Sequence, residues 1–289
     1  MSDVTRQCRA AVRWGGSMFP AFYIFGKQIG MYGVCAVIGF LISGFVGSKL
    51  ARRRGISTED LILAALAAAV GLFIGGHILF GLTDFGKLIR LFGMIGSISV
   101  GSFFYCLGII FGGSVFYGGL LGGIAAVSVF CRVSHSVDRM DMLDVMAVCV
   151  PLFHTFGRIG CFFGGCCYGI PCSIGFTVTE NPFNPAICGV SRFPVQLVEA
   201  GCNLIIFFVL LSLSSRRQLR GQMMYVYFLI YPVVRFSLEF LRGDEIRGIW
   251  FGLSTSQWIS IALFVFALIR VLLSAGRTPE PIDGDAAQS

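Results

Sequence analysis

The chain has 289 residues, of which 56% are hydrophobic and only 13% are charged, and its mean hydropathy is +0.82. A water-soluble domain carries about a quarter charged residues to cover its surface, so this composition excludes a soluble globular protein. The net charge of +7 lies mostly in basic clusters beside apolar segments. This indicates contact with anionic lipid headgroups and not with nucleic acid.

Apolar blocks of roughly twenty residues, the length of helix that crosses a ~30 Å hydrocarbon core, recur along the chain. They predict spans at about 29–49, 61–81, 114–131, 144–164, 195–214, 222–241 and 254–274. The block 91–111 is also apolar but rich in glycine and serine, and we expect it to be re-entrant or interfacial. The predicted fold is an all-α integral membrane protein of about seven transmembrane helices around a polar intramembrane cavity.

Basic residues predict the orientation of this bundle. Clusters follow the first, third, fifth and last spans, and placing all of them in the cytoplasm requires an even number of crossings between clusters. This arrangement predicts an extracytoplasmic N-terminal segment at 1–28, one transmembrane domain at 29–274 and a disordered cytoplasmic tail at 275–289. The basic residues of the N-terminal segment would then lie outside, which argues against this orientation. No removable signal peptide is expected, because no small-residue cleavage pattern precedes the first span.

The fourth span runs PLFHTFGRIGCFFGGCCYG from Pro151, with His154, Arg158 and Cys161 on one face. Pro151 and the glycines of 157–169 predict a kinked or broken helix. Irregular backbone at membrane depth is tolerated only where it is buried in protein or lines a cavity. The alternatives are that the glycines serve only helix packing and that His154 is only a packed histidine.

The fifth span places Gln196, Glu199 and Asn203 on one face. Amides in membrane helices usually make interhelical hydrogen bonds, so we expect this trio to give support, with Glu199 as the counter-ion of an arginine.

The sixth span places four polar residues within an arc of ~80° on an otherwise apolar helix. They are Tyr231, Arg235, Glu239 and Arg242. Two alternatives are that Arg235 and Glu239 form only a structural ion pair, and that Arg242 extends to the headgroups. Guanidinium groups stay charged when buried and bind phosphate oxygens in pairs. An arginine cluster with few carboxylates therefore predicts an anion, and a phospholipid phosphate is the one available at that depth.

Eleven cysteines are present, and four of them cluster near the predicted outer end of the fourth span. The cluster is Cys161, Cys166, Cys167 and Cys172, with Cys188 in the following loop. Its spacing does not match the paired C-x2-C pattern of zinc sites. Packing, a disulfide within the 166–188 loop, and metal or thiol chemistry all remain open for this cluster.

Six segments of the chain follow one another in a set order, and this ordered set is specific for one family although no single segment is. They are MYGVCAVIGF (31–40), FYGGLLGG (116–123), GRIGCFFGGCCYG (157–169), RFPVQLVE (192–199), YPVVRFSLEFLRGD (231–244) and GLSTSQWIS (252–260). Across about residues 18–270 they resemble the bacterial prolipoprotein diacylglyceryl transferase family.

This resemblance implies an enzyme of the bacterial plasma membrane that uses no cofactor and no metal. It would transfer the diacylglyceryl group of phosphatidylglycerol to the cysteine thiol of a secreted lipoprotein precursor, forming a thioether and releasing glycerol-1-phosphate. Arg158 and Arg235 would bind the phosphate, Glu239 would orient Arg235, and Arg242 would hold a headgroup or gate the exit. The positions implied to bind substrate or shape its cavity are Tyr32, Gly118, Gly119, Asp144, Cys161, Gly169, Glu199, Tyr231 and Arg242.

The chain departs from the family pattern at several of these positions. The family has a histidine, proposed as the base, where this chain has Tyr117, and a phenol with a pKa near ~10 is a poor base. His154 is a possible substitute. Cys161, Cys166 and His77 replace the family's asparagine, carboxylate and arginine.

These departures leave four hypotheses. The chain is a working transferase, or a paralogue with the same donor and another acceptor. From other classes, it is an anion or lipid transporter, for which the expected internal repeat was not found, or a cysteine-based redox or metal sensor.

Overall fold

The computed structural model describes residues 14–16, 21–25, 27–83, 85–181, 184–244 and 249–275. The predicted tail from 276 onward and most of the predicted N-terminal segment therefore lie outside the described residues. The helices are α2 (Met31–Arg53), α3 (Thr58–Thr83), α4 (Phe85–Gly93), α5 (Val100–Ile110), α6 (Phe116–Ser134), α7 (Arg139–Gly164), α8 (Val195–Leu213), α9 (Met223–Glu239) and α10 (Thr255–Ala275). The strands are β1 (Trp14–Gly16), β2 (Ala21–Ile24), β3 (Lys27–Gly30), β4 (Pro171–Val178), β5 (Ser191–Arg192), β6 (Ile249–Trp250) and β7 (Leu253–Ser254).

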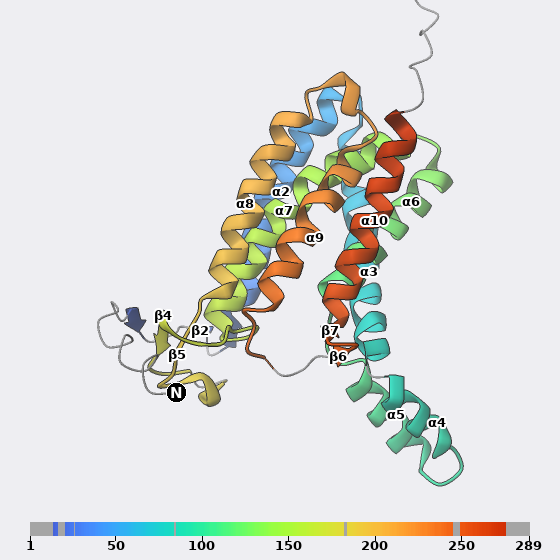
Figure 1. Ribbon diagram of the computed structural model, residues 1–289. Helices are drawn as coiled ribbons and strands as arrows, with labels where there is room; N and C mark the ends of the chain where they lie inside the picture. The colour runs from blue at the N-terminus through green and yellow to red at the C-terminus, as the bar shows by residue number, and fades with distance from the viewer. Residues whose placement is uncertain are drawn as a thin grey trace, which may run out of the picture.

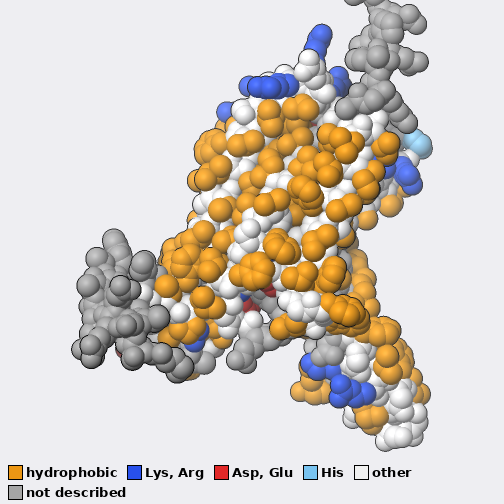
Figure 2. Space-filling model, viewed as in Figure 1, with side chains coloured by type: hydrophobic (Ala, Val, Ile, Leu, Met, Phe, Trp, Pro, Cys, Tyr) orange, Lys and Arg blue, Asp and Glu red, His pale blue; other side chains and the backbone are white. Residues whose placement is uncertain are grey.

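The predicted all-α membrane fold is confirmed. Within the described chain, six helices are long and apolar enough to cross a membrane: α2, α3, α6, α7, α8 and α10. The predicted 222–241 span corresponds to α9, whose 17 residues lie at the lower end of the spanning range of ~17–25. It runs between α8 and α10 in the bundle (Figure 1). Hydrophobic side chains cover the visible flank of the bundle, as a lipid-facing surface requires (Figure 2).

The segment 91–111 does not re-enter the bundle. It belongs to a hairpin of two short helices, α4 and α5, that projects beyond one end of α3 (Figure 1). The hairpin exposes large apolar side chains, among them Phe92, Phe104 and Tyr105, while Lys87 and Arg90 share α4 with them. This amphipathic character favours the interfacial alternative, which stays a prediction.

Glycines allow α3 and α6 to pack with their backbones in contact. A Cβ added at Gly118 would lie 2.3 Å from the carbonyl oxygen of Gly75, and one at Gly122 would lie 2.2 Å from that of Gly71. Both helices thus carry the G-x3-G spacing that brings membrane helices together. Gly119 likewise faces α3, at Leu72. Gly118 and Gly119 therefore both form the α3–α6 contact, and their part in shaping the substrate cavity stays a prediction.

Substitution of Gly118 by alanine should destabilise the protein by about 1–3 kcal/mol, because the obstructing atom belongs to the backbone of α3 and cannot rotate away. Gly44→Ala in α2 is the matched control, since nothing lies within 4 Å of a Cβ at that position. Unfolding of the two variants in detergent would test this. Equal stability of both variants would contradict the packing role.

Helix α7 is continuous through Pro151, so of the two predicted forms, kinked or broken, the break at Pro151 is wrong and the kink stays a prediction. The helix runs from Arg139 to Gly164 and ends where Gly165 takes a left-handed conformation, with φ of +69°. The hydroxyl of Thr155 donates to the carbonyl of Pro151 at 2.9 Å, one turn earlier on the same helix. Of the glycines in this helix, Gly160 makes a packing contact, because a Cβ there would lie 3.1 Å from Cα of Tyr32.

Asp144 joins two loops at the end of the bundle where α7 begins. Its carboxylate accepts hydrogen bonds from Nη1 of Arg54 at 2.7 Å, the amide of Gly221 at 2.6 Å and the amide of Met223 at 2.9 Å. Fourteen residues separate Asp144 from Arg158 on one helix, a rise of about 21 Å. Asp144 therefore lies at the opposite end of α7 from Arg158, and a role for it in shaping the cavity stays a prediction.

Short strands, which the sequence analysis did not predict, cover the other end of α7. Strand β4 pairs with β1 in parallel and with β5 in antiparallel orientation, and β2 and β3 form a hairpin that leads into α2. These strands and the N-terminal start of α2 lie at the same end of the bundle (Figure 1). They hold the loop that follows α7 against the bundle.

Candidate functional site

The buried polar site is centred on an ion pair between two helices. Nη2 of Arg158 on α7 lies 2.9 Å from Oε1 of Glu199 on α8, and their side chains are 8% and 1% exposed. The hydroxyl of Tyr231 on α9 donates to the same carboxylate oxygen at 3.2 Å. Glu199 thus joins three helices and is the counter-ion of Arg158. Neither group faces the acyl chains.

His154 lies one turn before Arg158 and is held on both sides. Its Nε2 accepts a hydrogen bond from Nε of Arg158 at 3.2 Å and lies 3.8 Å from Oε1 of Glu199. Its ring stacks on that of Phe116, with centroids 3.9 Å apart and planes 11° from parallel. Because Arg158 always donates, Nε2 must be unprotonated, and the neutral ring carries its proton on Nδ1.

Arg235 reaches the same region from α9. Its Nη1 lies 2.7 Å from Oε2 of Glu239, and its Nη2 donates to the hydroxyl of Ser256 on α10 at 3.3 Å. Arg235 is 4% exposed. Guanidinium groups from two helices are therefore buried inside the bundle, each paired with its own carboxylate.

Tyr117 lies deep in the bundle and binds α10. Its hydroxyl is 2.6 Å from Oγ of Ser260, whose own hydroxyl donates to the backbone carbonyl of Ser256 at 2.8 Å. Ser260 must therefore accept, and the phenol of Tyr117 donates. The sequence analysis did not assign a role to Ser256 or Ser260. The signal was available, because they form a polar pair four residues apart on an otherwise apolar helix.

Arg242 follows the end of α9 and is not extended toward headgroups. Its side chain is 6% exposed and pairs with Asp244 at 2.8 Å. Gly169 lies beside it, and a Cβ there would be 2.3 Å from the carbonyl oxygen of Phe193 and 3.0 Å from that of Leu241. Gly169 is thus a close backbone junction at which the loop after α7 joins the end of α9.

The charges of the site are more balanced than the sequence suggested. Each of its three arginines has a carboxylate partner. The pairs are Arg158 with Glu199, Arg235 with Glu239, and Arg242 with Asp244. The expected excess of positive charge is therefore not found among the described residues. A guanidinium carries five N–H donors, however, and these ion pairs use only part of them, so donors remain for a phosphate.

Three thiols gather at the end of α7. The sulfur atoms of Cys161, Cys166 and Cys167 all lie within 4.8 Å of one another. Hydrogen bonds from the other two thiols and the charges of Arg242 and Arg158 lower the pKa of Cys167 well below its usual value. All three are free thiols, as are Cys172 and Cys188, so the considered disulfide is not formed. Tyr32, at the start of α2, is 53% exposed, and its Cα lies 3.1 Å from where a Cβ would stand on Gly160 of α7.

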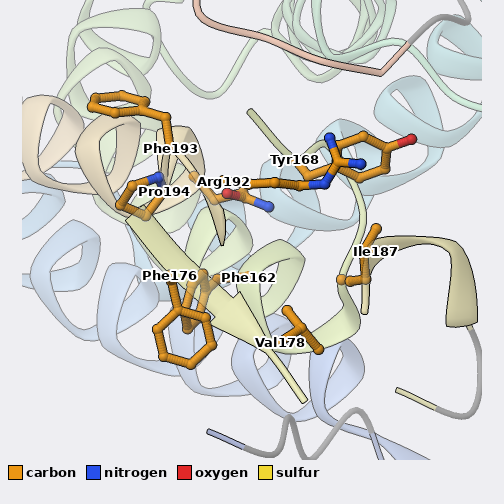
Figure 3. Close-up of a pocket in the computed structure, with 10 residues that line it drawn as sticks. Phe162, Tyr168, Phe176, Val178, Ile187, Arg192, Phe193 and Pro194 are labelled. Carbon is orange, nitrogen blue, oxygen red and sulfur yellow. The ribbon is translucent and has the colours of Figure 1, made fainter. Parts of the chain in front are cut away.

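Two cavities flank the site. The one in Figure 3 lies between the end of α7 and strands β4 and β5, where Arg192 stacks over the ring of Tyr168 at 4.5 Å. Its volume of about 20 Å³ suits a water molecule but not a lipid headgroup. The other, about 240 Å³, is an apolar groove between α9 and α10 that reaches Ser260. Figure 2 shows charged atoms in a hollow of the surface on this side.

His77 is separate from these groups. Its Nδ1 lies 2.8 Å from the backbone carbonyl of Phe111, and its ring packs on Phe73 within α3.

Known proteins resemble this chain over most of its length. A family model described as prolipoprotein diacylglyceryl transferase matches residues 20–273. A phosphatidylglycerol–prolipoprotein diacylglyceryl transferase of Clostridium tetani (strain Massachusetts / E88) is 32% identical over 256 residues, 86% of this chain and 96% of the relative. Transferase 2 of the same name from Clostridium perfringens (strain 13 / Type A) is 29% identical, covering 85% and 91%. A relative from Campylobacter lari (strain RM2100 / D67 / ATCC BAA-1060) is 28% identical, covering 86% and 90%.

Proposed function

The chain belongs to the prolipoprotein diacylglyceryl transferase family, and we propose that the site around Arg158 and Arg235 carries out that family's reaction. The chain is a multi-pass membrane transferase of lipoprotein biosynthesis. Its donor is phosphatidylglycerol, and its acceptor is the cysteine thiol of a lipoprotein precursor. The observation that carries the assignment to this site is the burial of two arginines from different helices inside the bundle, each held by a carboxylate.

The two arginines would act on the phosphate of the donor lipid. When the bond between the glyceryl carbon and the phosphate oxygen breaks, a second negative charge develops on the departing phosphoglycerol. Preorganised donors stabilise such a charge by ~3–4 kcal/mol each. Glu199 would orient Arg158, and Glu239 would orient Arg235. Tyr231 would support Glu199, and the groove between α9 and α10 would admit an acyl chain beside the arginines.

Neither candidate base is well placed to accept a proton. The phenol of Tyr117 donates to Ser260, and the lone pair of His154 Nε2 is used by Arg158. Tyr117 would therefore position α10, and His154 would position Arg158. Cys161 would act close to the headgroup as a member of the thiol cluster. Gly169 would act there through its backbone bridge to Arg242.

Tyr117→Phe should lower the transfer rate by less than about tenfold, because it removes one buried hydrogen bond worth ~0.5–1.5 kcal/mol. The pH dependence of the rate should be unchanged, since Tyr117 does not take up the proton. A loss of three orders of magnitude, or a shifted pH profile, would identify Tyr117 as the base.

The orientation with the C-terminus in the cytoplasm is supported by basic side chains at one end of the bundle, while the α4–α5 hairpin at the other end carries Lys87 and Arg90. Lys and Arg side chains gather at the end of the bundle where α2, α8 and α10 end (Figure 2). Basic loops remain on the cytoplasmic side. The site at the opposite end of α7 would then open toward the outer leaflet, where secreted precursors emerge.

The test supplies purified protein in detergent with phosphatidylglycerol and a peptide that carries a lipoprotein cysteine motif. A peptide heavier by one diacylglyceryl group, with release of glycerol-1-phosphate, is the expected result. A matched peptide with serine in place of cysteine should remain unmodified. Release of glycerol-1-phosphate without a lipidated peptide would favour another acceptor, and no consumption of lipid would contradict the assignment.

A further inference from the structure

The thiols of Cys161 and Cys166 are brought together by the way in which α7 ends. The amide of Cys166 donates to the carbonyl of Cys161 at 3.2 Å, and the amide of Gly165 donates to that of Phe162 at 3.2 Å. These are the two hydrogen bonds of a Schellman motif, in which the side chains at the first and sixth positions meet. Gly165 is required there, because a Cβ would lie 2.3 Å from Nδ2 of Asn181.

Cys167 completes the cluster through an unusual backbone conformation. Its φ of +54° lies in the left-handed region, which costs a residue other than glycine or asparagine about 1–3 kcal/mol. The loop is fixed by two hydrogen bonds. The side-chain amide of Gln196 donates to the carbonyl of Cys166 at 2.8 Å, and the backbone amide of Gly243 donates to that of Tyr168 at 2.9 Å. Three sulfur atoms are thus held together at a cost in backbone strain, on a scaffold attached to α8 and α9.

The spacing of these sulfur atoms suits a thiolate-bound metal ion. Zn²⁺ binds cysteine sulfur at ≈2.3 Å, so tetrahedral ligands lie about 3.8 Å apart. The three thiols already lie within 4.8 Å of one another, and shifts of about one ångström would complete the geometry. Sites with three protein ligands keep a fourth position open and are typical of catalytic zinc. The cysteine spacing lacks the paired C-x2-C pattern of zinc sites, and the sequence left metal chemistry open as one of several alternatives for this cluster. The approach of Cys166 to Cys161 at the helix end cannot be read from that spacing.

The environment of the cluster fits the charge of such a site. Three thiolates and a divalent ion carry a net charge of −1, and a fourth thiolate makes it −2. The guanidinium groups of Arg158 and Arg242 both act on Cys167. Cys166 is exposed, so the cluster can be reached from outside, while Arg158 is the residue to which the phosphate is assigned. An acceptor thiol at the cluster would therefore be close to the donor lipid.

We propose that Cys161, Cys166 and Cys167 bind a zinc-like divalent ion whose open position takes the acceptor cysteine and holds it as a thiolate. This inference rests on the proposed transferase function. On binding, the acceptor S–H bond gives its proton to water. The thiolate sulfur then attacks the glyceryl carbon of the lipid, the C–S bond forms, and the bond from that carbon to the phosphate oxygen breaks with its electron pair. Phosphoglycerol leaves with the added negative charge, and the neutral thioether is a weaker ligand that departs. The bound ion thus promotes deprotonation of the acceptor thiol, a task that Tyr117 does not perform.

Cobalt(II) binding to the reduced full-length protein in detergent, without oxygen, tests the site independently of catalysis. Thiolate ligands give Co²⁺ a near-ultraviolet charge-transfer band, and tetrahedral coordination gives strong visible bands. One Co²⁺ per chain, displaced by Zn²⁺, is expected. Cys166→Ser should weaken binding at least tenfold, and Cys188→Ser is the matched control that should leave it unchanged. Because Cys166 is exposed, its substitution leaves the packing of the bundle intact.

Peptide addition distinguishes this inference from the transferase assignment. A peptide with the acceptor cysteine should shift the visible bands of the cobalt protein, and its serine counterpart should not. Absence of a thiolate band, an equal band in Cys166→Ser, or transfer activity that survives complete chelation would overturn the inference while leaving the transferase function standing. A peptide-dependent shift without any lipid transfer would support the thiol site and contradict the transferase function.

Discussion

Replacing Arg158 by glutamine is expected to lower the rate of diacylglyceryl transfer by about 10²–10³-fold, which corresponds to the loss of one preorganised donor to the leaving phosphate. Lysine at this position should restore little of the rate, because a point charge does not reproduce two parallel N–H donors. The rate of lipidated peptide formation at saturating phosphatidylglycerol measures the effect. Arg132→Gln, at an exposed arginine of the basic end, is the matched control and should leave the rate unchanged.

The same substitution leaves Glu199 as a buried charge without Arg158, which costs ~3–5 kcal/mol of stability and would by itself reduce activity. The double variant Arg158→Gln with Glu199→Gln removes both charges of the pair. It should regain most of the thermal stability and none of the activity. Recovery of activity together with stability would show that Arg158 has only a structural role.

Replacement of Asp144 by alanine is expected to lower the free energy of unfolding by about 3–5 kcal/mol, because the carboxylate satisfies Arg54 and two backbone amides in a buried position. Asp144→Asn should cost less, since it keeps an acceptor oxygen. Thermal unfolding in detergent measures the loss, and Glu59→Ala, at an exposed acidic residue of α3, is the control.

The fraction of Asp144→Ala protein that remains folded should keep its transfer rate, because Asp144 lies about 21 Å along α7 from Arg158. A specific loss of activity at unchanged stability would instead place Asp144 in the transfer reaction. Together the two measurements distinguish Asp144 from Glu199. Loss of Asp144 should affect stability alone, whereas loss of Glu199 should affect both activity and stability.

The charge balance of the site changes how anion binding is explained. The sequence suggested arginines with few carboxylates, whereas the structure pairs Arg158, Arg235 and Arg242 with one carboxylate each. Each of these carboxylates offsets the charge of its arginine, so net positive charge alone does not explain phosphate binding. Recognition of a phosphate would depend on oriented N–H donors in a low-dielectric surrounding, where hydrogen bonds are electrostatically stronger.

The sequence by itself determined the membrane fold, the approximate spans and the inward faces of α7, α8 and α9. Hydropathy and the 3.6-residue period are local properties, so Arg158, Glu199 and Arg235 could be assigned to polar faces without knowledge of their partners. The ordered segments also pointed to the family that the comparisons show.

Only the tertiary structure decided which residues meet. The pairing of Arg158 with Glu199, the contact of Gly118 with Gly75 and the position of Asp144 between two loops depend on how separate helices are placed. The 3.6-residue period of a single helix carries no information about distances between residues on different helices. The thiol cluster has the same origin, because Cys166 returns to Cys161 through the hydrogen bonds that end α7. A membrane helix reveals which of its faces is polar, but the neighbouring helices and loops determine what that face touches.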